Sequence, residues 1–363
     1  MTRQAIAVIG GDGIGPEVVH AARGVLESAG RCYGIDFSFD EFEWGAEYYF
    51  RHGLMMPPSA LDVLRSFDAI LLGAVGHPDI PDHITLSGLL LPIRRGFDLY
   101  ANVRPAVLFA GVDSPLAGRG PGDIDLVVVR ENTEGEYAPV GGFVYHNQPD
   151  EVAVQSAIFT RRGTERIIRY AFELARTRRK RVTSITKSNA QGYGMVLWDR
   201  TFEAVASEYA GVETDSLLVD AAAMDFVRHP EAFDVVVASN LFGDILSDLA
   251  AIVSGSIGLA ASANLDPARR APSMFEPVHG SAPDIVGRGV ANPLAAILSA
   301  GMMLDHLGHT EASRAVHAAV AGVLAEGLVR TPDLGGSSTT AEVARAVSAR
   351  LDRSAPEPAR EAP

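Results

Sequence analysis

The sequence of 363 residues has a single cysteine, Cys32. A lone cysteine closes no internal disulfide and builds no thiolate metal cage, which fits a reducing compartment. Long apolar runs are also absent: none approaches the length of a membrane span, and the apolar stretch near the N-terminus is too short for a signal peptide. We therefore predict a cytoplasmic protein that does not bind a membrane.

The chain also has few positive charges. It has 31 lysines and arginines against 45 aspartates and glutamates, which gives a formal net charge of -14. Nucleic-acid binding needs clustered lysine and arginine. The one basic run, 176–181, is typical of a helix C-terminus, where positive charge complements the helix dipole. We expect no nucleic-acid partner.

Short β-branched runs alternate with longer segments of helical periodicity. This alternation predicts an α/β fold whose sheet is largely parallel. From Asn292 onward three helical patterns follow one another, and residues 354–363 have the composition of a disordered tail. The β-branched runs are AIAVIG (5–10), DAILLGAV (68–75), DLVVVRE (125–131), RVTSITK (181–187) and DVVVAS (234–239).

Residues 139–159 differ from this pattern and form two extended pieces joined by the turn-rich residues 147–150. We expect a β-hairpin arm here. An isolated hairpin is marginally stable in water, so another subunit is its natural packing partner.

The opening VIGGDGIGPEV (8–18) places glycines between a strand and a helix. The dinucleotide fingerprint G-x-G-x-x-G does not fit, because it would put Asp12 or Pro16 on a required glycine. A strand-to-helix turn without a ligand is the alternative.

Two aspartates stand four residues apart in SNLFGDILSDLA (239–250), so Asp244 and Asp248 share one face of a predicted helix. On an exposed face their repulsion would cost only a few tenths of a kcal/mol. Their neighbours are apolar, however, and half-buried paired carboxylates need a cation, for which Mg²⁺ or Mn²⁺ is suited. Asp220, after the strand-like SLLV, joins them only through the fold.

Four arginines stand out in this acidic chain: Arg94, Arg95, Arg104 and Arg130. Converging guanidinium groups would suit a dicarboxylic substrate, and structural salt bridges are the alternative. The loop FEPVHGSAPDIVGRGVANP (275–293) precedes the helix expected near Asn292 and exposes backbone N–H groups. Such a loop can hold a phosphate or adenosine, or be a plain connection rich in glycine and proline.

Together these motifs, from GDGIGPE (11–17) to TPDLGGSSTT (331–340), resemble the β-decarboxylating dehydrogenases, the family of isocitrate, isopropylmalate, homoisocitrate, tartrate and D-malate dehydrogenases. The resemblance covers nearly the whole chain. It implies an isopropylmalate dehydrogenase-like fold of two lobes that share a central sheet. The large nucleotide-binding lobe would comprise 1–102 and 256–353, and the small lobe 103–255 would carry a dimerisation arm near 139–159.

The resemblance also implies the cofactors. Asp284 would accept hydrogen bonds from the ribose of NAD and repel the 2′-phosphate of NADP. A divalent ion, magnesium or manganese, would bind Asp220, Asp244 and Asp248, and a monovalent cation is left open as a further cofactor. The residues implied around the adenosine are His279, Gly280, Ser281, Ala282, Asp284, Ile285 and Asn292.

By the same resemblance, Arg94, Arg104 and Arg130 would hold the substrate carboxylates. Lys187 would be the base that takes the hydroxyl proton, and Tyr137 would protonate the enolate carbon after carbon dioxide leaves. The family supplies the residues at the positions of Lys187 and Asp220 across a two-fold axis, so we expect a homodimer with shared active sites.

The segments that bear on substrate choice resemble different subgroups of the family. Ser87 stands where isopropylmalate dehydrogenases carry an acidic residue, whereas Leu90 and Leu91 keep their apolar pair. The segments 73–88 and 130–142 resemble tartrate and D-malate dehydrogenases most, and VDAAAM (219–224) resembles isopropylmalate dehydrogenase.

We therefore predict NAD-dependent oxidative decarboxylation of a small 2-hydroxy dicarboxylic acid of the D-malate or tartrate type. The alternative is the 3-isopropylmalate dehydrogenase of leucine biosynthesis. A non-catalytic regulatory homologue is disfavoured, because such subunits tend to lose a catalytic or metal residue and this chain keeps all five: Tyr137, Lys187, Asp220, Asp244 and Asp248.

Overall fold

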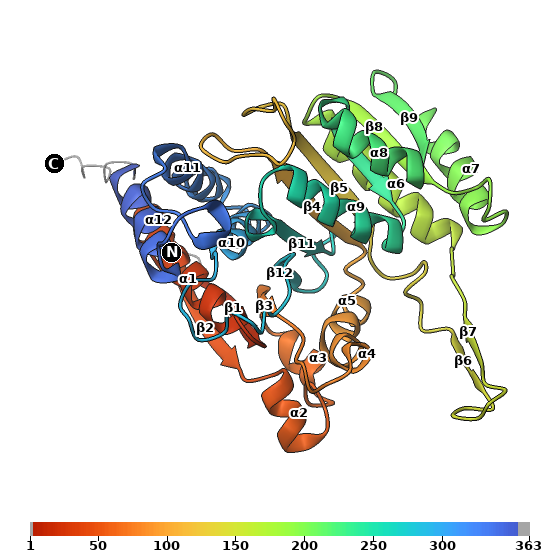
Figure 1. The fold of residues 1–363 in the computed structure, drawn as a ribbon, viewed down its shortest axis with the longest axis horizontal. Helices are drawn as coiled ribbons and strands as arrows, with labels where there is room; N and C mark the ends of the chain where they lie inside the picture. The colour runs from red at the N-terminus through yellow and green to blue at the C-terminus, as the bar shows by residue number, and fades with distance from the viewer. Residues whose placement is uncertain (1–2, 355–363) are drawn as a thin grey trace.

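The computed structural model describes residues 3–354, and its centre is one ten-stranded mixed sheet (Figure 1). The strand order is β2-β1-β3-β12-β11-β4-β5-β10-β8-β9. β11 runs antiparallel to β12 and β4, and β4 runs antiparallel to β5, whereas the other neighbouring strands described in this ten-stranded sheet are parallel. The predicted α/β fold with a largely parallel sheet is confirmed. The strands are β1 Arg3–Gly11, β2 Asp36–Phe42, β3 Ala69–Ala74, β4 Ala101–Val107, β5 Asp125–Glu131, β6 Gly141–Val144, β7 Val152–Gln155, β8 Arg181–Thr186, β9 Glu213–Leu218, β10 Val235–Ala238, β11 Ala261–Leu265 and β12 Ser273–Pro277.

Helices cover this sheet and follow most of the predicted strands. The four helices α1, α10, α11 and α12 pack against one another, α6 packs on α7, and α8 packs on α9. The three helical patterns expected after Asn292 are α10, α11 and α12. The helices are α1 Gly15–Tyr33, α2 Ala46–His52, α3 Ala60–Leu64, α4 Asp82–Thr85, α5 Leu91–Gly96, α6 Arg161–Arg176, α7 Gly194–Ala206, α8 Val219–Arg228, α9 Asn240–Val253, α10 Leu294–His306, α11 Thr310–Glu326 and α12 Thr340–Ser354, with a π-helical turn Leu86–Leu90 and 3-10 turns Pro230–Ala232, Ile257–Leu259 and Pro332–Leu334.

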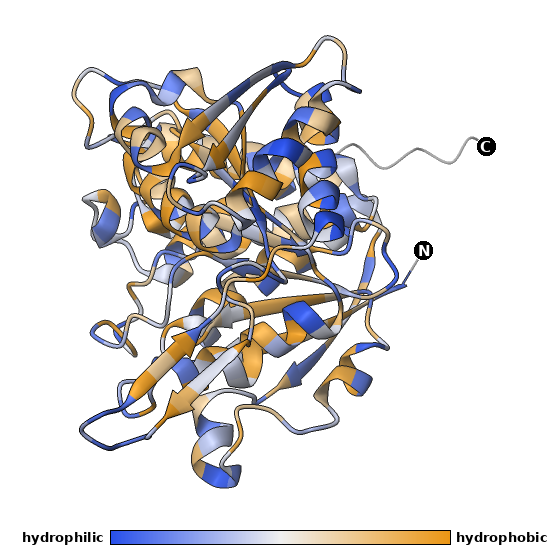
Figure 2. Cartoon of the chain, turned by 90° about the vertical axis from the view of Figure 1, so that its right-hand side faces the viewer, coloured by the Kyte–Doolittle hydropathy of each residue, from blue (hydrophilic) through white to orange (hydrophobic). Residues whose placement is uncertain are grey.

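The apolar run of β1 is continuous because both of its faces are buried. Ile6 and Val8 belong to the larger core, together with residues of α1 and α10. Ala7 and Ile9 point the other way, into a second core that includes residues of α3 and α5. In Figure 2 the strands are largely hydrophobic in colour, whereas many outer turns are hydrophilic.

Helix α9 approaches β5 closely because a glycine stands at the contact. A Cβ atom added at Gly243 would lie 2.7 Å from Cβ of Arg130. Any larger residue would push the helix outward and move Asp244 away from Arg130. The glycine in NLFGD therefore sets the position of the aspartates that follow it.

The predicted hairpin arm is present as β6 and β7, paired antiparallel with Val144 opposite Val152. It projects from the body of the chain (Figure 1). Its large side chains are exposed, among them Phe143 at 61% and Tyr145 at 60%. Exposed apolar residues on a lone hairpin are typical of a surface that another chain covers.

Five strands of the sheet, β2, β4, β9, β11 and β12, were not among the predicted β-branched runs, although SLLV at the end of β9 was described as strand-like. β11 and β12 are short and carry the buried polar residues Asn264 and Glu276, which break the apolar signal. Within the described residues, no helix is both long and apolar enough to cross a membrane. Of the predicted tail 354–363, Ser354 ends α12 and the rest lies outside the described residues. The bounds of the two lobes stay a prediction.

Candidate active site

A cavity of about 260 Å³ lies where β3 and β12 end and α9 begins. The carboxyl ends of strands in open α/β sheets are where such proteins usually bind ligands. We call it the arginine cavity. Its lining residues are Gly73, Ala74, Val75, Leu86, Leu90, Leu91, Arg94, Arg104, Arg130, Tyr137, Asp244, Asp248, Glu276, Pro277, Val278, His279 and Gly280.

Three of the predicted substrate arginines, Arg94, Arg104 and Arg130, meet in this cavity, and each is at most 7% exposed. Burial lowers the pKa of Arg104 and of Arg130, and the neighbouring positive charge of Arg104 lowers that of Arg130 further. The Nε atoms of Arg94 and Arg104 are buried without a hydrogen-bond partner. Buried cations with free N–H groups are stabilised by an anion, so this cluster suits a carboxylate ligand.

The two predicted metal ligands of α9, Asp244 and Asp248, both reach the cavity. Asp244 Oδ1 accepts hydrogen bonds from Arg104 Nη1 at 3.1 Å and from Arg130 Nη1. Burial alone would raise the pKa of Asp244, but the two arginines outweigh it and lower that pKa. Asp248 is the more exposed of the pair, and burial together with the charge of Asp244 raises its pKa.

Tyr137 lies against Asp244 and donates its hydroxyl proton to Oδ2 at 2.7 Å. Its ring centroid is 5.3 Å from the guanidinium carbon of Arg130. Burial, followed by the hydrogen bond to Asp244, raises the pKa of Tyr137 to about 12, so the phenol keeps its proton at neutral pH. Arg95, the fourth arginine noted in the sequence, does not line the cavity. Its Nη2 donates to the backbone oxygen of Tyr137 at 2.7 Å and so helps to position that residue.

Glu276 is a residue of the cavity that the sequence reasoning missed. It is 7% exposed, and its Oε1 accepts hydrogen bonds from Arg94 Nη2 at 2.7 Å and from Asn264 Nδ2 at 2.9 Å. Asn264 in turn accepts from Asn102 at 3.0 Å and from Asn132 at 2.9 Å. This buried chain of amides holds the Arg94 guanidinium in place. The one available signal was its place as the glutamate of the predicted ligand loop 275–293.

Lys187 and Asp220 lie together but outside the arginine cavity. Lys187 Nζ donates to Asp220 Oδ1 at 2.7 Å, at the start of α8, and neither residue lines the cavity. Among the described residues, no three acidic, histidine or cysteine side chains are grouped closely enough to hold a metal. One chain therefore brings together two of the three predicted metal ligands and leaves the third with the predicted base.

Two of the three residues predicted to determine substrate choice line the arginine cavity, and the third does not. Leu90 and Leu91 line the cavity, and so does Leu86, which was not predicted. Ser87 is exposed on the same π-helical turn and does not line it. Leucines thus supply much of the apolar lining of the cavity.

The predicted cofactor loop closes the other side of the cavity through His279 and Gly280. A second cavity of about 710 Å³ continues from Gly280 and Ser281 along the loop of residues 75–82. His279, which lines the arginine cavity, is 9% exposed, and its Nε2 is buried without a hydrogen-bond partner. The loop bends sharply at Ala282, whose φ is 41°.

The N-terminal glycine turn, for which no ligand was assigned, supports this loop. Ile14 N–H donates to Ser281 O at 2.9 Å, and a Cβ atom at Gly13 would lie 2.0 Å from the same oxygen. Asp12, 5% exposed, accepts from Ala46 N at 2.6 Å and from Gly76 N at 2.8 Å. The turn therefore joins the loops on both sides of the 710 Å³ cavity.

Further along the loop, Asp284 is exposed and Ile285 is half-buried. Asn292 is buried at the other end, where its Nδ2 donates to Asp333 Oδ2 at 2.9 Å and its Oδ1 accepts from Leu294 N at 3.0 Å. The Asn292 side chain thus anchors the start of α10, and Asp284 is free to meet a ligand.

In chemical terms, the site offers a buried cationic wall for carboxylates, two half-buried carboxylates for a hard cation, and a protonated phenol next to both. That combination supports oxidation or lyase chemistry on a small dicarboxylate more readily than it supports nucleophilic catalysis, since the lining has no serine or cysteine.

Known proteins share this architecture. A probable tartrate dehydrogenase/decarboxylase of Bacillus subtilis (strain 168) is 52% identical over 353 residues, which cover 97% of this chain and 99% of that protein. The D-malate dehydrogenase [decarboxylating] of Escherichia coli (strain K12) is 52% identical over 355 residues, covering 96% and 98%. The crystal structure of isocitrate dehydrogenase from Methylococcus capsulatus matches with a TM-score of 0.87 and 39% identity, covering 96% of this chain and 99% of that one.

The predicted resemblance to tartrate and D-malate dehydrogenases is confirmed by these relatives. The family model described as isocitrate/isopropylmalate dehydrogenase matches residues 5–347. The chain therefore belongs to the isocitrate/isopropylmalate dehydrogenase family.

Proposed function

We propose that this chain oxidises and decarboxylates a small 2-hydroxy dicarboxylic acid of the D-malate or tartrate type, using NAD and a divalent metal. The observation that carries the proposal is the meeting of Arg94, Arg104 and Arg130 with Asp244 and Tyr137 in one small cavity. Relatives that are 52% identical over almost the full chain are named for tartrate and D-malate.

The arginine cavity, with a volume of about 260 Å³, is large enough for a small dicarboxylic acid. Its three arginines would hold the two carboxylates of a four-carbon acid of the kind for which the relatives are named. The specific observation in favour of 3-isopropylmalate is the apolar part of the lining, Leu86, Leu90 and Leu91, which would accept an alkyl group.

Charge balance supports both a dicarboxylate and a divalent cation. Three arginines and three carboxylates, Asp244, Asp248 and Glu276, line the cavity, so its formal charge is close to zero. Adding a dicarboxylate together with Mg²⁺ or Mn²⁺ keeps it there, whereas either alone would leave buried charge unbalanced.

Asp244 and Asp248 fit such an ion, because both present hard oxygen ligands from one helix face. The bound metal supplies Lewis-acid stabilisation of negative charge on the substrate oxygens. Asp244 also accepts hydrogen bonds from Arg104 and Arg130, so the proposed metal ligand and the carboxylate-binding arginines are held next to each other.

The chain's own residues handle the protons. Arg94, Arg104 and Arg130 orient the acid, and Tyr137 holds a proton at its hydroxyl, within the cavity, for delivery to carbon after decarboxylation. Lys187 takes the substrate hydroxyl proton. NAD, when bound, accepts the hydride, and Asp284 selects it over NADP by repelling a 2′-phosphate.

Lys187 and Asp220 reach this site from a second copy of the chain. Two exposed apolar surfaces support such a dimer: the arm, with Phe143 and Val154, and the outer faces of α8 and α9. The latter carry Met224, Val227, Ile245 and Ile252, each at least 42% exposed. Apolar patches of this kind mark protein interfaces.

The test is a rate panel of D-malate, tartrate, 3-isopropylmalate and isocitrate, each with NAD and Mn²⁺. We expect the highest kcat/KM with D-malate or tartrate. A value for 3-isopropylmalate that is higher by about tenfold or more would replace this proposal with the leucine-pathway alternative, since an alkyl group in an apolar pocket is worth roughly 10–200-fold.

A further inference from the structure

A further cavity lies at the opposite end of the central strands from the active site. Its volume is about 400 Å³, and it is formed around the starts of β1, β3 and β12. β3 and β12 run from this cavity at their first residues to the arginine cavity at their last. We call it the basic cavity. Its lining residues are Gln4, Arg65, Phe67, Asp68, Arg269, Arg270, Ala271, Pro272, His306 and Leu307.

The lining carries three arginines against one carboxylate, Asp68, in a chain whose net charge is -14. Arg270 is neutralised, because its Nη2 lies 3.1 Å from Asp266 Oδ1. Arg65 lies over the Phe97 ring at 5.4 Å, and among the described residues neither Arg65 nor Arg269 forms an ion pair. Asp68 already accepts a hydrogen bond from Ala5 N at 2.7 Å. The cavity therefore has uncompensated positive charge.

The turn that presents Arg269 is held rigid by a buried carboxylate. Asp266 is 1% exposed, and its oxygens accept from Ala268 N at 3.2 Å and from Arg270 N at 2.8 Å. Between these two anchors Arg269 is held at φ 52°, a left-handed conformation that is uncommon for a residue with a side chain. Since the turn is fixed before any ligand arrives, binding there loses little backbone entropy.

His306 completes the cavity at the end of α10. Its ring centroid is 5.7 Å from that of Phe275, and burial together with the charge of Arg269 lowers its pKa to about 4. The imidazole is therefore neutral at physiological pH and offers one N–H donor next to Arg269. An anion with several oxygens is what these donors match.

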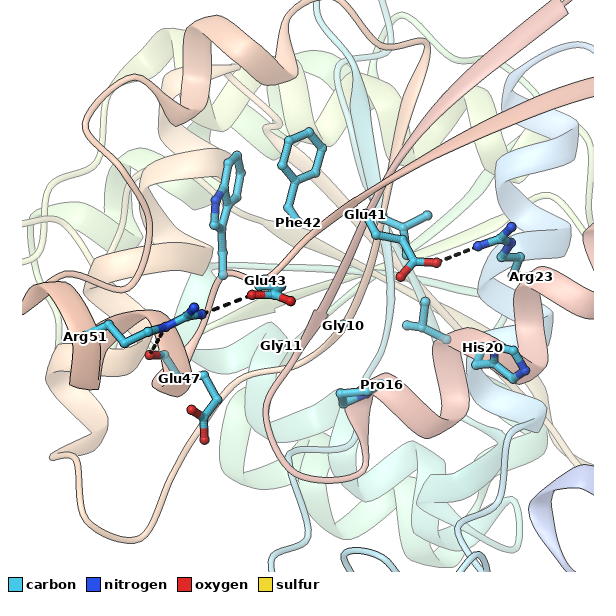
Figure 3. A pocket seen from close by; sticks show the side chains of 13 residues that line it. Gly10, Gly11, Pro16, His20, Arg23, Glu41, Phe42, Glu43, Glu47 and Arg51 are labelled. Atoms are coloured by element: carbon cyan, nitrogen blue, oxygen red, sulfur yellow. Dashed lines mark hydrogen bonds and ion pairs between the residues drawn. The ribbon is translucent and has the colours of Figure 1, made fainter.

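The groove between α1, β2 and α2 differs from the basic cavity, because its arginines are paired with carboxylates of the same chain (Figure 3). It has a volume of about 590 Å³ and also contains two arginines. There, Arg23 pairs with Glu41 at 2.5 Å and Arg51 pairs with Glu43 at 3.2 Å. Both guanidinium groups are neutralised within the chain, so that groove has no excess positive charge for an anion.

We propose that the basic cavity binds a small multivalent oxyanion, a phosphate group or a polycarboxylate, through Arg65, Arg269 and His306. Guanidinium groups bind both classes through paired N–H···O contacts, and about 400 Å³ accommodates either. The site is separate from the arginine cavity and does not depend on the reaction performed there.

The experiment is calorimetric titration of the full chain with inorganic phosphate and, separately, with citrate, at an ionic strength held constant with sodium chloride. The variant is Arg65→Gln with Arg269→Gly, because glycine adopts the positive φ of residue 269 without strain and the turn is retained. Arg314→Gln, an exposed arginine on α11 outside the cavity, is the matched control.

We expect saturable binding of at least one anion, weakened by about tenfold or more in the double variant and unchanged in the control. Tighter binding of phosphate would identify a phosphoryl compound as the ligand, and tighter binding of citrate a polycarboxylate. Any citrate bound in the arginine cavity is common to all three proteins and cancels in the comparison. Identical isotherms for the three proteins, or no heat beyond that of sodium chloride, would overturn the proposal.

Discussion

Lys187 donates a 2.7 Å hydrogen bond to Asp220, and this pair stands outside the cavity that contains Tyr137 and Asp244. Lys187, the proposed base, forms an ion pair with one predicted metal ligand and lies away from the other two, as expected if this pair completes an active site in a second chain. The two halves of that site meet if each chain lends this pair to its partner. The exposed arm and the apolar faces of α8 and α9 are the surfaces that would bring them together.

Mixing two inactive variants tests this arrangement. Lys187→Ala and Tyr137→Phe chains, co-refolded in equal amounts, should regain about one quarter of wild-type activity, because half of the dimers are mixed and each has one intact site. Each variant refolded alone should stay inactive. If the mixture is no more active than its components while size-exclusion chromatography shows dimers, each site is built from one chain.

Cofactor choice should depend on the exposed carboxylate of Asp284. NAD should be preferred, and Asp284→Ser should raise kcat/KM for NADP relative to NAD by about tenfold, since it removes repulsion of the 2′-phosphate. Steady-state kinetics with both nucleotides measures the ratio. Asp62→Ser, at an exposed position of α3 outside both cavities, is the control for a general change of charge and should leave the ratio unaltered. A wild-type enzyme that uses NADP equally well would show that Asp284 does not face the ribose.

Removal of the divalent metal should abolish turnover. Asp244 and Asp248 would hold the cation that stabilises negative charge on the substrate oxygens, so without it the decarboxylation would lack its Lewis acid. Treatment with EDTA followed by assay, with Mn²⁺ added back, measures the dependence. Asp244→Asn should lose activity and also the rise in Tm that Mn²⁺ gives the wild type. Full activity after chelation would contradict the assignment of Asp244 and Asp248.

How far the sequence predicts the structure depends on whether the signal is local. The parallel strands and the shared face of Asp244 and Asp248 follow from periodicity within a few residues, and both are present in the structure. The N-terminal glycine turn was harder, because its role is to support a loop about 270 residues away through Ile14 and Ser281. No local pattern contains that contact.

Buried polar residues are the main feature of the structure that the sequence did not predict. β11 and β12 carry Asn264 and Glu276 in place of apolar side chains, so their strand signal is weak, although the two residues are 0% and 7% exposed. Their hydrogen bonds join β4, β11 and β12, reach Asn132 just after β5, and end on the Arg94 guanidinium. Such a network exists only after the strands pair, and therefore the sequence could show the arginines but not what holds them.

Glu276 should position Arg94 for the substrate. Glu276→Gln removes the negative charge 2.7 Å from the guanidinium and should raise KM for the acid by about tenfold with a smaller change in kcat, because the lost effect is on binding geometry. Glu41→Gln removes a carboxylate that pairs with Arg23 on the surface, and it should leave both constants unchanged. A fall in kcat at constant KM would instead place Glu276 in the chemical step.

Stability should fall in mild acid because of His306. Burial, with the charge of Arg269, lowers its folded-state pKa from 6.5 to about 4. As pH falls from 6.5 toward 4, the unfolded chain takes up a proton that the folded chain excludes, so the free energy of unfolding decreases across this window by on the order of 2 kcal/mol. Above pH 6.5 this stabilisation is fully present.

Urea unfolding at a series of pH values measures this effect. The free energy of unfolding should change less steeply with pH in His306→Gln than in wild type, and the exposed His20→Gln should keep the wild-type dependence on pH. Equal slopes in all three proteins would show that the imidazole is charged in the folded state, and would also remove the neutral donor from the basic cavity.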